Sequence, residues 1–314
     1  GRGWRGATGL GAAGRPTSAG GSSNPGYVGA RVRARRGELY GDEEYRELVR
    51  MSPAEIARFM EESTYESAIN ALGSRHGGVD LVEYALNQNL AVQFEAILEW
   101  SEGELYDLVA RYLRKFDAWN LKTVIRGVYT GASREAVEAD LIRAGEFDDR
   151  QIRRLLDADS IEAVVEAAEE TIYDEPLRAA YPAFEESDVL VPLENAVDRA
   201  FYDRLLTGLP GGEPVRQYEA FLEAEVDFRN AANALRLARS GAEIDPAEYF
   251  IDGGQLFTRT SLARLARNLD ELVEYVAGSQ YADDLGPVPR AAAEAGSVME
   301  GGQGTGVGRW AYAE

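Results

Sequence analysis

The feature that most constrains this 314-residue chain is an internal repeat of about 110 residues. The segment DAWNLKTVIRGVYTG at 117–131 returns as DFRNAANALRLARSG at 227–241 without a gap. Identical residues occupy four pairs of positions, namely Asp117 and Asp227, Asn120 and Asn230, Arg126 and Arg236, and Gly131 and Gly241. A unit that recurs at a fixed period buries its apolar face against its neighbours. We therefore expect related structural clusters packed side by side.

A third, partial copy lies near the N-terminus. The segments STYESAI, TIYDEPL and SQYADDL place Tyr65, Tyr173 and Tyr281 at a spacing of 108 residues, and Arg36-Gly37 and Gly41 echo Arg126-Gly127 and Gly131. The chain thus contains the latter half of one unit followed by two whole units. We expect the missing opening half at the C-terminus, where it would close a ring of three similar bundles.

Apolar spacing and capping signals predict an all-α fold. Ser52-Pro53-Ala54-Glu55 and Asp245-Pro246-Ala247-Glu248 combine a capping oxygen, a proline at the first helical position and a glutamate that reaches back. Ser101 and Glu104 predict a third capping box, and Gly131 and Gly241 predict left-handed helix ends. A further apolar stripe with spacings of three and four is formed by Phe221, Ala224, Phe228, Ala231, Leu235 and Ala238.

The repeated polar residues have a structural and a functional interpretation, and the structural one is favoured. Asp117 and Asn120, three residues apart, share a helix face, as do their counterparts at 227 and 230. Buried, such a pair fixes helix register by hydrogen bonding. Arg126 and Arg236 lie near helix C-termini, where a cation is stabilised by about 0.3–1 kcal/mol. The three tyrosines are predicted to be core or hinge residues.

The charge excludes several classes of partner. The formal net charge is -21, from 54 acidic and 33 basic residues, and only Lys115 and Lys122 among the basic residues are lysines. Such a negative chain repels nucleic acid and anionic lipid, which argues against both as direct partners. An acidic, arginine-rich surface is typical of a protein from a halophile, since strong salt screens the self-repulsion.

The sequence predicts no catalytic centre and no cofactor. It has no cysteine and one histidine, His76, in a predicted loop, so neither a transition-metal site nor a catalytic triad is expected. The pattern of Gly302, Gly304, Gly306 and Gly308 is a weak dinucleotide-binding signal because no strand precedes it. No segment approaches the roughly 20 apolar residues of a membrane helix.

Four segments together resemble the C subunit of the archaeal A-type ATP synthase, a relative of the d subunit of V-type ATPases. They are YVGARVRARRGELYGDEEYRELVRMSPAEIARFMEE (27–62), GGVDLVEYALNQNLAVQFEAILEW (77–100), YLRKFDAWNLKTVIRGVYTGAS (112–133) and LENAVDRAFYDRLL (193–206). The resemblance covers residues 27–290. It implies a funnel of three similar helical bundles that holds no catalytic residue.

The resemblance also implies a function and partners. Such a protein is peripheral and lies on the cytoplasmic side of the cell membrane. It couples the central stalk to the membrane ring of proteolipid subunits during proton-driven ATP synthesis, and reaches the membrane only through these partners. Arg111 and Arg114 are the predicted rim contacts, although a solvated face explains both as well. The alternative is a helical scaffold that binds soluble proteins.

Two departures from the family pattern affect the expected architecture. Gly29 replaces the asparagine of the family's Tyr-Val-Asn-Ala-Arg, and residues 291–314 do not match the family's C-terminal helices, so the third bundle is expected to be incomplete. We accordingly expect five parts: a disordered or extraneous segment (1–26), part of a first repeat (27–76), a second repeat (77–187), a third repeat (188–290) and a divergent, flexible tail (291–314).

Overall fold

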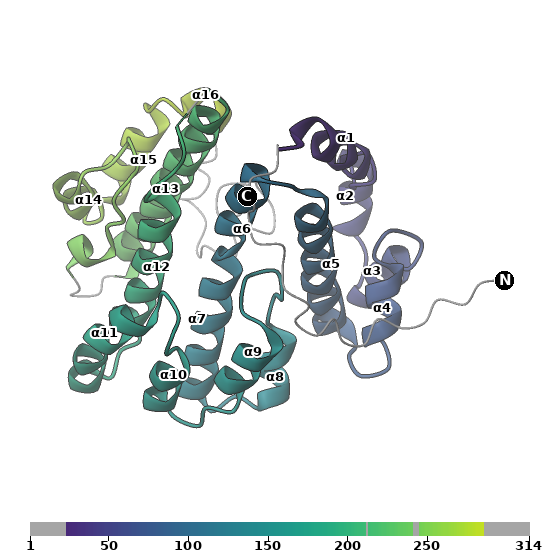
Figure 1. Ribbon diagram of the computed structural model, residues 1–314, viewed down its shortest axis with the longest axis horizontal. Coiled ribbons are helices and arrows are strands. Elements are labelled where there is room, and N and C mark those ends of the chain that lie inside the picture. The colour runs from purple at the N-terminus through teal and green to yellow at the C-terminus, as the bar shows by residue number, and fades with distance from the viewer. Residues whose placement is uncertain (1–22, 212, 241–244, 286–314) are drawn as a thin grey trace. The chain divides into compact units, whose positions relative to one another are not determined.

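The protein is all-helical in the part of the chain that its computed structural model describes, residues 23–211, 213–240 and 245–285 (Figure 1). Every regular element in these ranges is an α-helix or a short 3₁₀ helix, and no strand occurs there. The predicted all-α class is therefore confirmed. The chain divides into two compact units, residues 1–174 and 175–314.

The first unit contains two helical groups. In the first group, α3 and α4 pack against the long α5, and α1 also contacts α5. In the second, α8, α9 and α10 pack on α7, the helix that follows α6. The helices are α1 (Pro25–Arg36), α2 (Asp42–Leu48), α3 (Pro53–Met60), α4 (Glu66–Leu72), α5 (Gly78–Trp100), α6 (Glu104–Leu113), α7 (Lys115–Thr130), α8 (Arg134–Ala139), α9 (Asp149–Leu156) and α10 (Ile161–Ala167).

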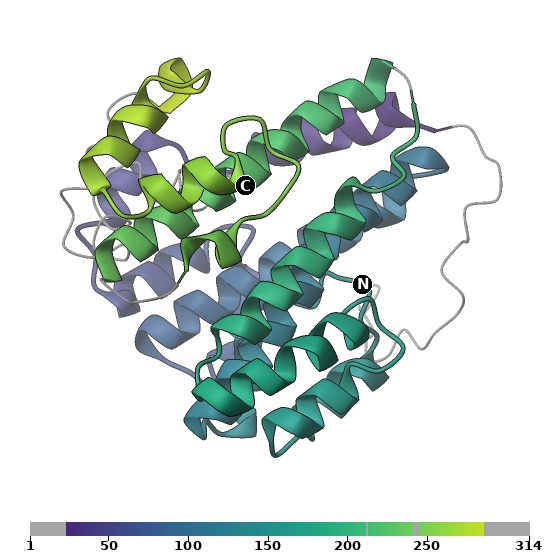
Figure 2. The same cartoon turned by 90° about the vertical axis from the view of Figure 1, so that its left-hand side faces the viewer.

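The second unit is organised around the 28-residue helix α13, against which α14, α15 and η1 pack, as the green and yellow-green helices of Figure 2 show. Its elements are α11 (Asp174–Ser187), which starts at the unit boundary, α12 (Val191–Leu206), α13 (Glu213–Ser240), η1 (Pro246–Tyr249), α14 (Arg259–Leu265), α15 (Leu269–Ala277) and α16 (Ala282–Leu285). In the described residues no helix is both long enough and apolar enough to cross a bilayer.

One predicted helix start is confirmed, one is confirmed in part and one is wrong. The Glu55 carboxylate accepts the N–H (2.8 Å) and the hydroxyl (2.7 Å) of Ser52, which lowers the Glu55 pKa, and Pro53 begins α3. Ser101 instead ends α5: its hydroxyl donates to the carbonyl of Ile97, and α6 begins after Gly103. Asp245 is the predicted cap, accepting the N–H of Ala247 at 3.1 Å, and Pro246 is the first helical residue, but the element is a four-residue 3₁₀ turn, η1.

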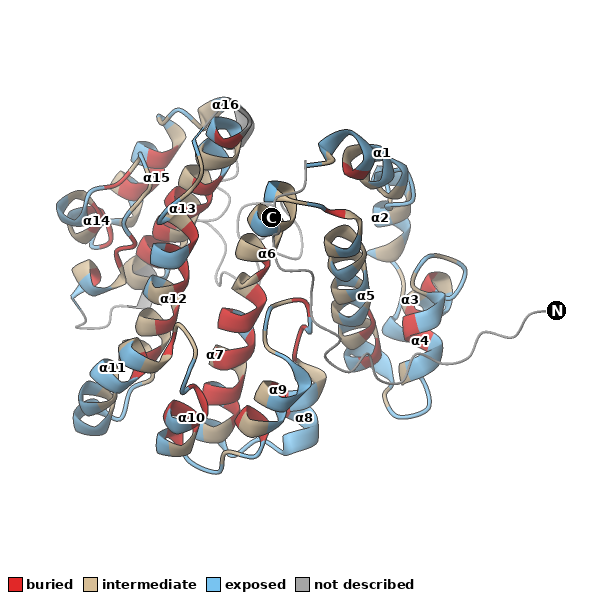
Figure 3. Ribbon diagram, viewed as in Figure 1, coloured by how far each residue is buried: buried red, intermediate tan, exposed pale blue. Residues whose placement is uncertain are grey.

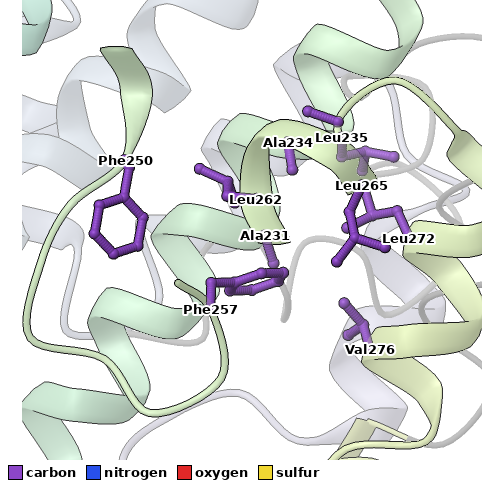
Figure 4. Packing of buried hydrophobic residues seen from close by; sticks show 10 residues of the cluster. Ala231, Ala234, Leu235, Phe250, Phe257, Leu262, Leu265, Leu272 and Val276 are labelled. Atoms are coloured by element: carbon purple, nitrogen blue, oxygen red, sulfur yellow. The ribbon is translucent and has the colours of Figure 1, made fainter. Parts of the chain in front are cut away.

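Buried apolar side chains form the cores of each unit (Figure 3). The second unit's cluster joins α13, α14 and α15, and Phe250 and Phe257 from the connecting segments complete it (Figure 4). The predicted stripe on α13 is wrong in its first turns. Phe221 is 44% exposed while the adjacent Leu222 is fully buried, because the buried face shifts around the helix before Ala231 and Leu235. Gly241 and the glycines at 302–308 lie outside the described residues.

Candidate functional site

The side chain of Asp117 holds the loop after α8 onto α7. Asp117 lies in the first turn of α7 and is 2% exposed. Its Oδ2 accepts the backbone N–H of Glu146 at 2.7 Å, and its Oδ1 accepts that of Phe147 at 3.0 Å. Two hydrogen bonds from backbone donors to one carboxylate are charge-assisted, and they satisfy loop groups that no helix ladder would pair.

One turn later, Asn120 binds the same loop. Its amide Nδ2 donates to the carbonyl of Ile142 at 2.8 Å, and its Oδ1 accepts the N–H of Ile142 at 2.8 Å. This pairing copies the two-way hydrogen bonding of a backbone amide and requires both a donor and an acceptor on one side chain. We call Asp117 and Asn120, with the loop Ile142–Phe147 that they bind, the first latch.

The second unit contains the same arrangement on α13, and we call it the second latch. Asp227 accepts the N–H of Gln255 (3.0 Å) and of Leu256 (2.8 Å), and it is fully buried. Asn230 donates to the carbonyl of Ile251 at 2.8 Å and accepts its N–H at 2.9 Å. The repeated Asp-x-x-Asn sequence therefore places the same four backbone bonds in two places.

Each latch depends on a glycine in its loop. A Cβ on Gly145 would lie 2.0 Å from Asp117 Oδ1, and a Cβ on Gly254 would lie 2.2 Å from Asp227 Oδ1. Any larger residue would push the carboxylate away from its donors. These glycines were not among the predicted residues, although IRAGEF at 142–147 and IDGGQL at 251–256 lie 109 residues apart and share both the isoleucine and the glycine.

The three tyrosines follow a common local turn. In each copy the hydroxyl two residues before the tyrosine accepts the tyrosine N–H and donates to a carbonyl three residues upstream. The N–H distances to the hydroxyl oxygens of Ser63, Thr171 and Ser279 are 3.3, 3.1 and 3.2 Å. Such turns end a helix by offering its last groups side-chain partners. The hydroxyl residue is present in all three segments of the sequence, but its hydrogen bond to the tyrosine N–H was not predicted.

The two latched copies differ in where the tyrosine hydroxyl donates. The Tyr281 hydroxyl donates to Asp227 Oδ2 at 2.8 Å, which makes it a third donor to that carboxylate. The Tyr173 hydroxyl instead donates to the backbone carbonyl of Arg114 at 3.3 Å. Burial first, and then the bond to Asp227, raises the pKa of Tyr281, so this phenol stays protonated at ordinary pH.

Of the two predicted rim arginines, Arg114 is engaged within the first unit. Its Nε and a terminal nitrogen bind the Glu146 carboxylate at 2.6 and 3.1 Å. Burial opposes the charge of Arg114, but the bond and attraction to Glu146 outweigh it and raise the pKa of the guanidinium. Arg114 thereby braces the residue whose N–H enters the first latch. Arg111 is half-buried on α6.

The remaining predicted positions lie at helix ends. Gly131 ends α7 with φ 68°, and its N–H bonds to the carbonyl of Val128. Arg126 is exposed near this end. Arg236 on α13 donates to Asn233 at 2.6 Å. Glycine is favoured at a helix end with left-handed backbone angles because glycine has no Cβ to clash there.

The polar groups gathered in these sites serve architecture. The latch carboxylates are buried and bound to backbone N–H groups, so they offer no proton or ligand to a substrate. Among the residues that the structure describes, no group of three His, Cys, Asp or Glu residues could hold a metal ion. His76 lies in a loop with its ring 4.8 Å from that of Tyr84. The fold and latches define a class: an all-helical protein in which loops are fastened to long helices.

Comparison with known proteins shows the family of the chain. A family model described as the ATP synthase (C/AC39) subunit matches residues 28–301, and the chain belongs to this family. It is 76% identical over 282 residues to the A-type ATP synthase C subunit of Halorubrum lacusprofundi, covering 90% of this chain and 81% of the relative.

Other relatives of the same name extend the similarity. The A-type ATP synthase C subunit of Haloferax volcanii is 69% identical over 265 residues, covering 84% of this chain and 76% of the relative. That of Methanosarcina mazei is 34% identical over 268 residues, covering 83% of this chain and 72% of the relative. Two of these relatives come from halophiles, which agrees with the halophilic source that the acidic composition predicted.

Proposed function

We propose that this chain is the C subunit of an A-type ATP synthase and couples the central stalk to the proteolipid ring as part of the rotor. The observation that carries the proposal is the family match over residues 28–301, together with 76% identity to a relative of that name. In this role the protein performs no chemistry. It sits on the cytoplasmic face of the membrane and is held there by the other subunits.

The latches support such a mechanical role. A part that transmits torque must deform little, and a loop joined to its helix by four backbone bonds has few ways to move. Each latch also buries its carboxylate, which is 2% exposed or less, so water competes little for its hydrogen bonds. We propose that the latched copies are two walls of a funnel of three related bundles, into which the tip of the stalk fits.

An affinity pull-down in high salt tests the proposal. The full chain is tagged in its host, and the proteins that co-purify from detergent-solubilised membranes are identified. We expect at least one central-stalk protein and the proteolipid. Recovery of soluble proteins alone would favour the alternative, a helical scaffold.

Turnover provides an independent test. We expect no ATP hydrolysis above background by the isolated chain, because the latch carboxylates are occupied and the described residues hold no metal cluster. ATP hydrolysis by the isolated chain at ordinary enzymatic rates of about 1–1,000 per second would refute the non-catalytic role.

A further inference from the structure

The two residues that precede α1 bind the corner at which α5 ends and α6 begins. The Asn24 side chain donates from Nδ2 to the carbonyl of Trp100 at 2.8 Å, and its Oδ1 accepts the N–H of Glu102 at 3.0 Å. The Ser23 hydroxyl oxygen accepts the N–H of Leu105 at 3.1 Å. These three bonds join positions that are 76 to 82 residues apart in the sequence. We call Ser23 and Asn24 the strap.

The corner supplies no side-chain cap of its own for α6. The residue before α6 is Gly103, whose φ of 59° favours glycine because a Cβ would be strained there. Glycine has no side-chain oxygen for the N–H groups at a helix start, whereas Ser133 and Ser160 accept such groups before α8 and α10. The bend of the corner requires a glycine, so the capping oxygen must come from elsewhere, and Ser23 provides it.

Asn24 binds the other side of the corner. Trp100 is the last residue of α5, and the carbonyls in the last turn of a helix have no partner within that helix. The hydroxyl of Ser101 donates back to the carbonyl of Ile97 and so serves an earlier group. A side-chain amide can donate to one backbone group and accept from another. Asn24 therefore ties the end of α5 to the turn that follows it.

Contacts between α1 and α5 keep the strap at the corner. Helix α1 lies at the end of α5 from which the chain turns into α6 (Figure 1). The guanidinium carbons of Arg31 and Arg35 lie 4.3 and 5.4 Å from the ring centre of Trp100. Arg35 also donates to Gln93 on α5. Pro25, the first residue of α1, restricts the backbone that joins the strap to the helix.

We propose that the strap fixes the angle of the α5–α6 corner and, through it, the position of the first helical group relative to the second. The corner is the direct chain connection between α5 of the first group and α6, which leads into the second. Without the strap, three backbone groups at the corner lose their partners, and the corner samples a range of angles. All of these contacts lie within the first unit, and none of them depends on what covers the outer face of α1.

An apolar cluster also joins the two groups and limits how far they can move. Phe94 and Leu98 of α5 pack against a core that includes Leu113 and Phe116, and the ring centres of Phe94 and Phe116 lie 5.2 Å apart. Apolar packing is non-directional, so it holds the helices side by side without selecting one angle. Hydrogen bonds are directional. We therefore expect loss of the strap to change the angle between the groups without separating them.

Hydrogen exchange of the full chain in high salt tests the contacts of the strap. Asn24→Ala should speed exchange of the Glu102 amide, and Ser23→Ala that of the Leu105 amide, each by about tenfold, because each amide loses its acceptor. The amide of Ala163, which is bound by Ser160, should keep its rate in both variants. Unchanged exchange at the corner would overturn the inference.

Distances between two spin labels test the position of the groups. The chain contains no cysteine, so Ala54→Cys on α3 and Ala136→Cys on α8, both exposed, place one label in each group. Asn24→Ala should broaden the distribution of label distances by about 1.5-fold or more, because the corner opens locally. Ser23→Ala removes only one of the three bonds and should broaden it less, which preserves the test if Asn24→Ala does not fold.

Asn70→Ala on α4 is the matched control for the distance measurement. Asn70 is exposed, and its replacement makes the same chemical change in the same unit, so the width should stay that of the parent chain. Equal widths in Asn24→Ala and Asn70→Ala would show that the strap caps the corner without fixing the groups, and would refute the proposal.

The strap and the proposed function can fail separately. A width that Asn24→Ala leaves unchanged would refute the strap and leave the co-purification of stalk and proteolipid as the test of the rotor assignment. A broadened width in a chain that co-purifies with neither protein would retain the strap and refute the rotor assignment.

Discussion

Helices α7 and α1 of the first unit differ both in how far they are buried and in whether they carry a latch. Half of the sixteen residues of α7 are buried, whereas α1 buries one residue of twelve (Figure 3). Helix α7 carries Asp117 and Asn120, which bind a loop. Helix α1 contains neither aspartate nor asparagine, and its exposed face holds arginines instead.

Of these two helices, the buried one is the helix that carries a latch. Propensity and apolar spacing form the helix in both cases, but the bound loop brings the following short helices down onto it. Substitutions in the latches and in α1 measure how much a latch contributes to the unfolding free energy. They follow in order from the largest expected effect to the smallest.

The largest effect is expected from removal of the Asp227 carboxylate. Asp227→Ala leaves the N–H groups of Gln255 and Leu256 and the Tyr281 hydroxyl without their acceptor, so we expect a loss of about 3 kcal/mol in unfolding free energy. Asp117→Ala removes the acceptor of two donors and should cost about 2 kcal/mol.

Denaturant unfolding in high salt and hydrogen exchange of the loop amides measure these losses. Asp203→Ala, at an exposed position on α12, is the control and should change the unfolding free energy by less than about 0.5 kcal/mol. Unchanged amide protection at Gln255 and Leu256 in Asp227→Ala would show that the latch does not hold its loop.

The next largest effect is expected at the latch glycines. Gly254→Ala and Gly145→Ala place a methyl group 2.2 and 2.0 Å from the latch oxygens, so the carboxylate must shift, at a cost of about 2 kcal/mol. Gly77→Ala is the matched control, because a Cβ there meets nothing within 4 Å. Thermal unfolding should separate the latch variants from the control by several degrees; coincident transitions would argue against the close approach.

A smaller, pH-dependent effect is expected from Tyr281. Its pKa is raised in the folded state, so the stabilisation is complete below the unfolded tyrosine pKa of about 10 and is lost as the pH rises above that value. Tyr281→Phe should cost about 1 kcal/mol at neutral pH and reduce the loss of stability between about pH 10 and 11. A pH profile of unfolding free energy that Tyr281→Phe leaves unaltered would contradict the assignment.

The smallest effect, with the opposite sign, is expected on α1. Gly29→Ala should stabilise the chain by about 0.5–1 kcal/mol, because Gly29 lies inside a helix and alanine restricts the unfolded chain. The nearest atom to a Cβ at Gly29 is a terminal nitrogen of Arg33, at 3.4 Å, which can move aside. A clear loss of unfolding free energy would mean that Gly29 is needed for close packing after all.

Much of the helical organisation was predictable because it depends on nearby residues. The capping at Ser52 and Glu55 and the helical class follow from contacts within a few positions of each other. The cap predicted at Ser101 failed, and the one at Asp245 begins only a short 3₁₀ turn. A capping oxygen serves whichever helix end the chain path brings to it, and that path depends on distant packing.

The sequence by itself determined that the chain is helical, acidic and repeated, because helical period, charge and self-similarity can be read from the residues alone. Only the tertiary structure decided what Asp117 and Asn120 bind, since their partners are backbone groups 22–30 residues away that any residue type could supply. It also decided that Gly145 and Gly254 are required. A glycine's role lies in the space it leaves, and that space exists only once the carboxylate is folded against it.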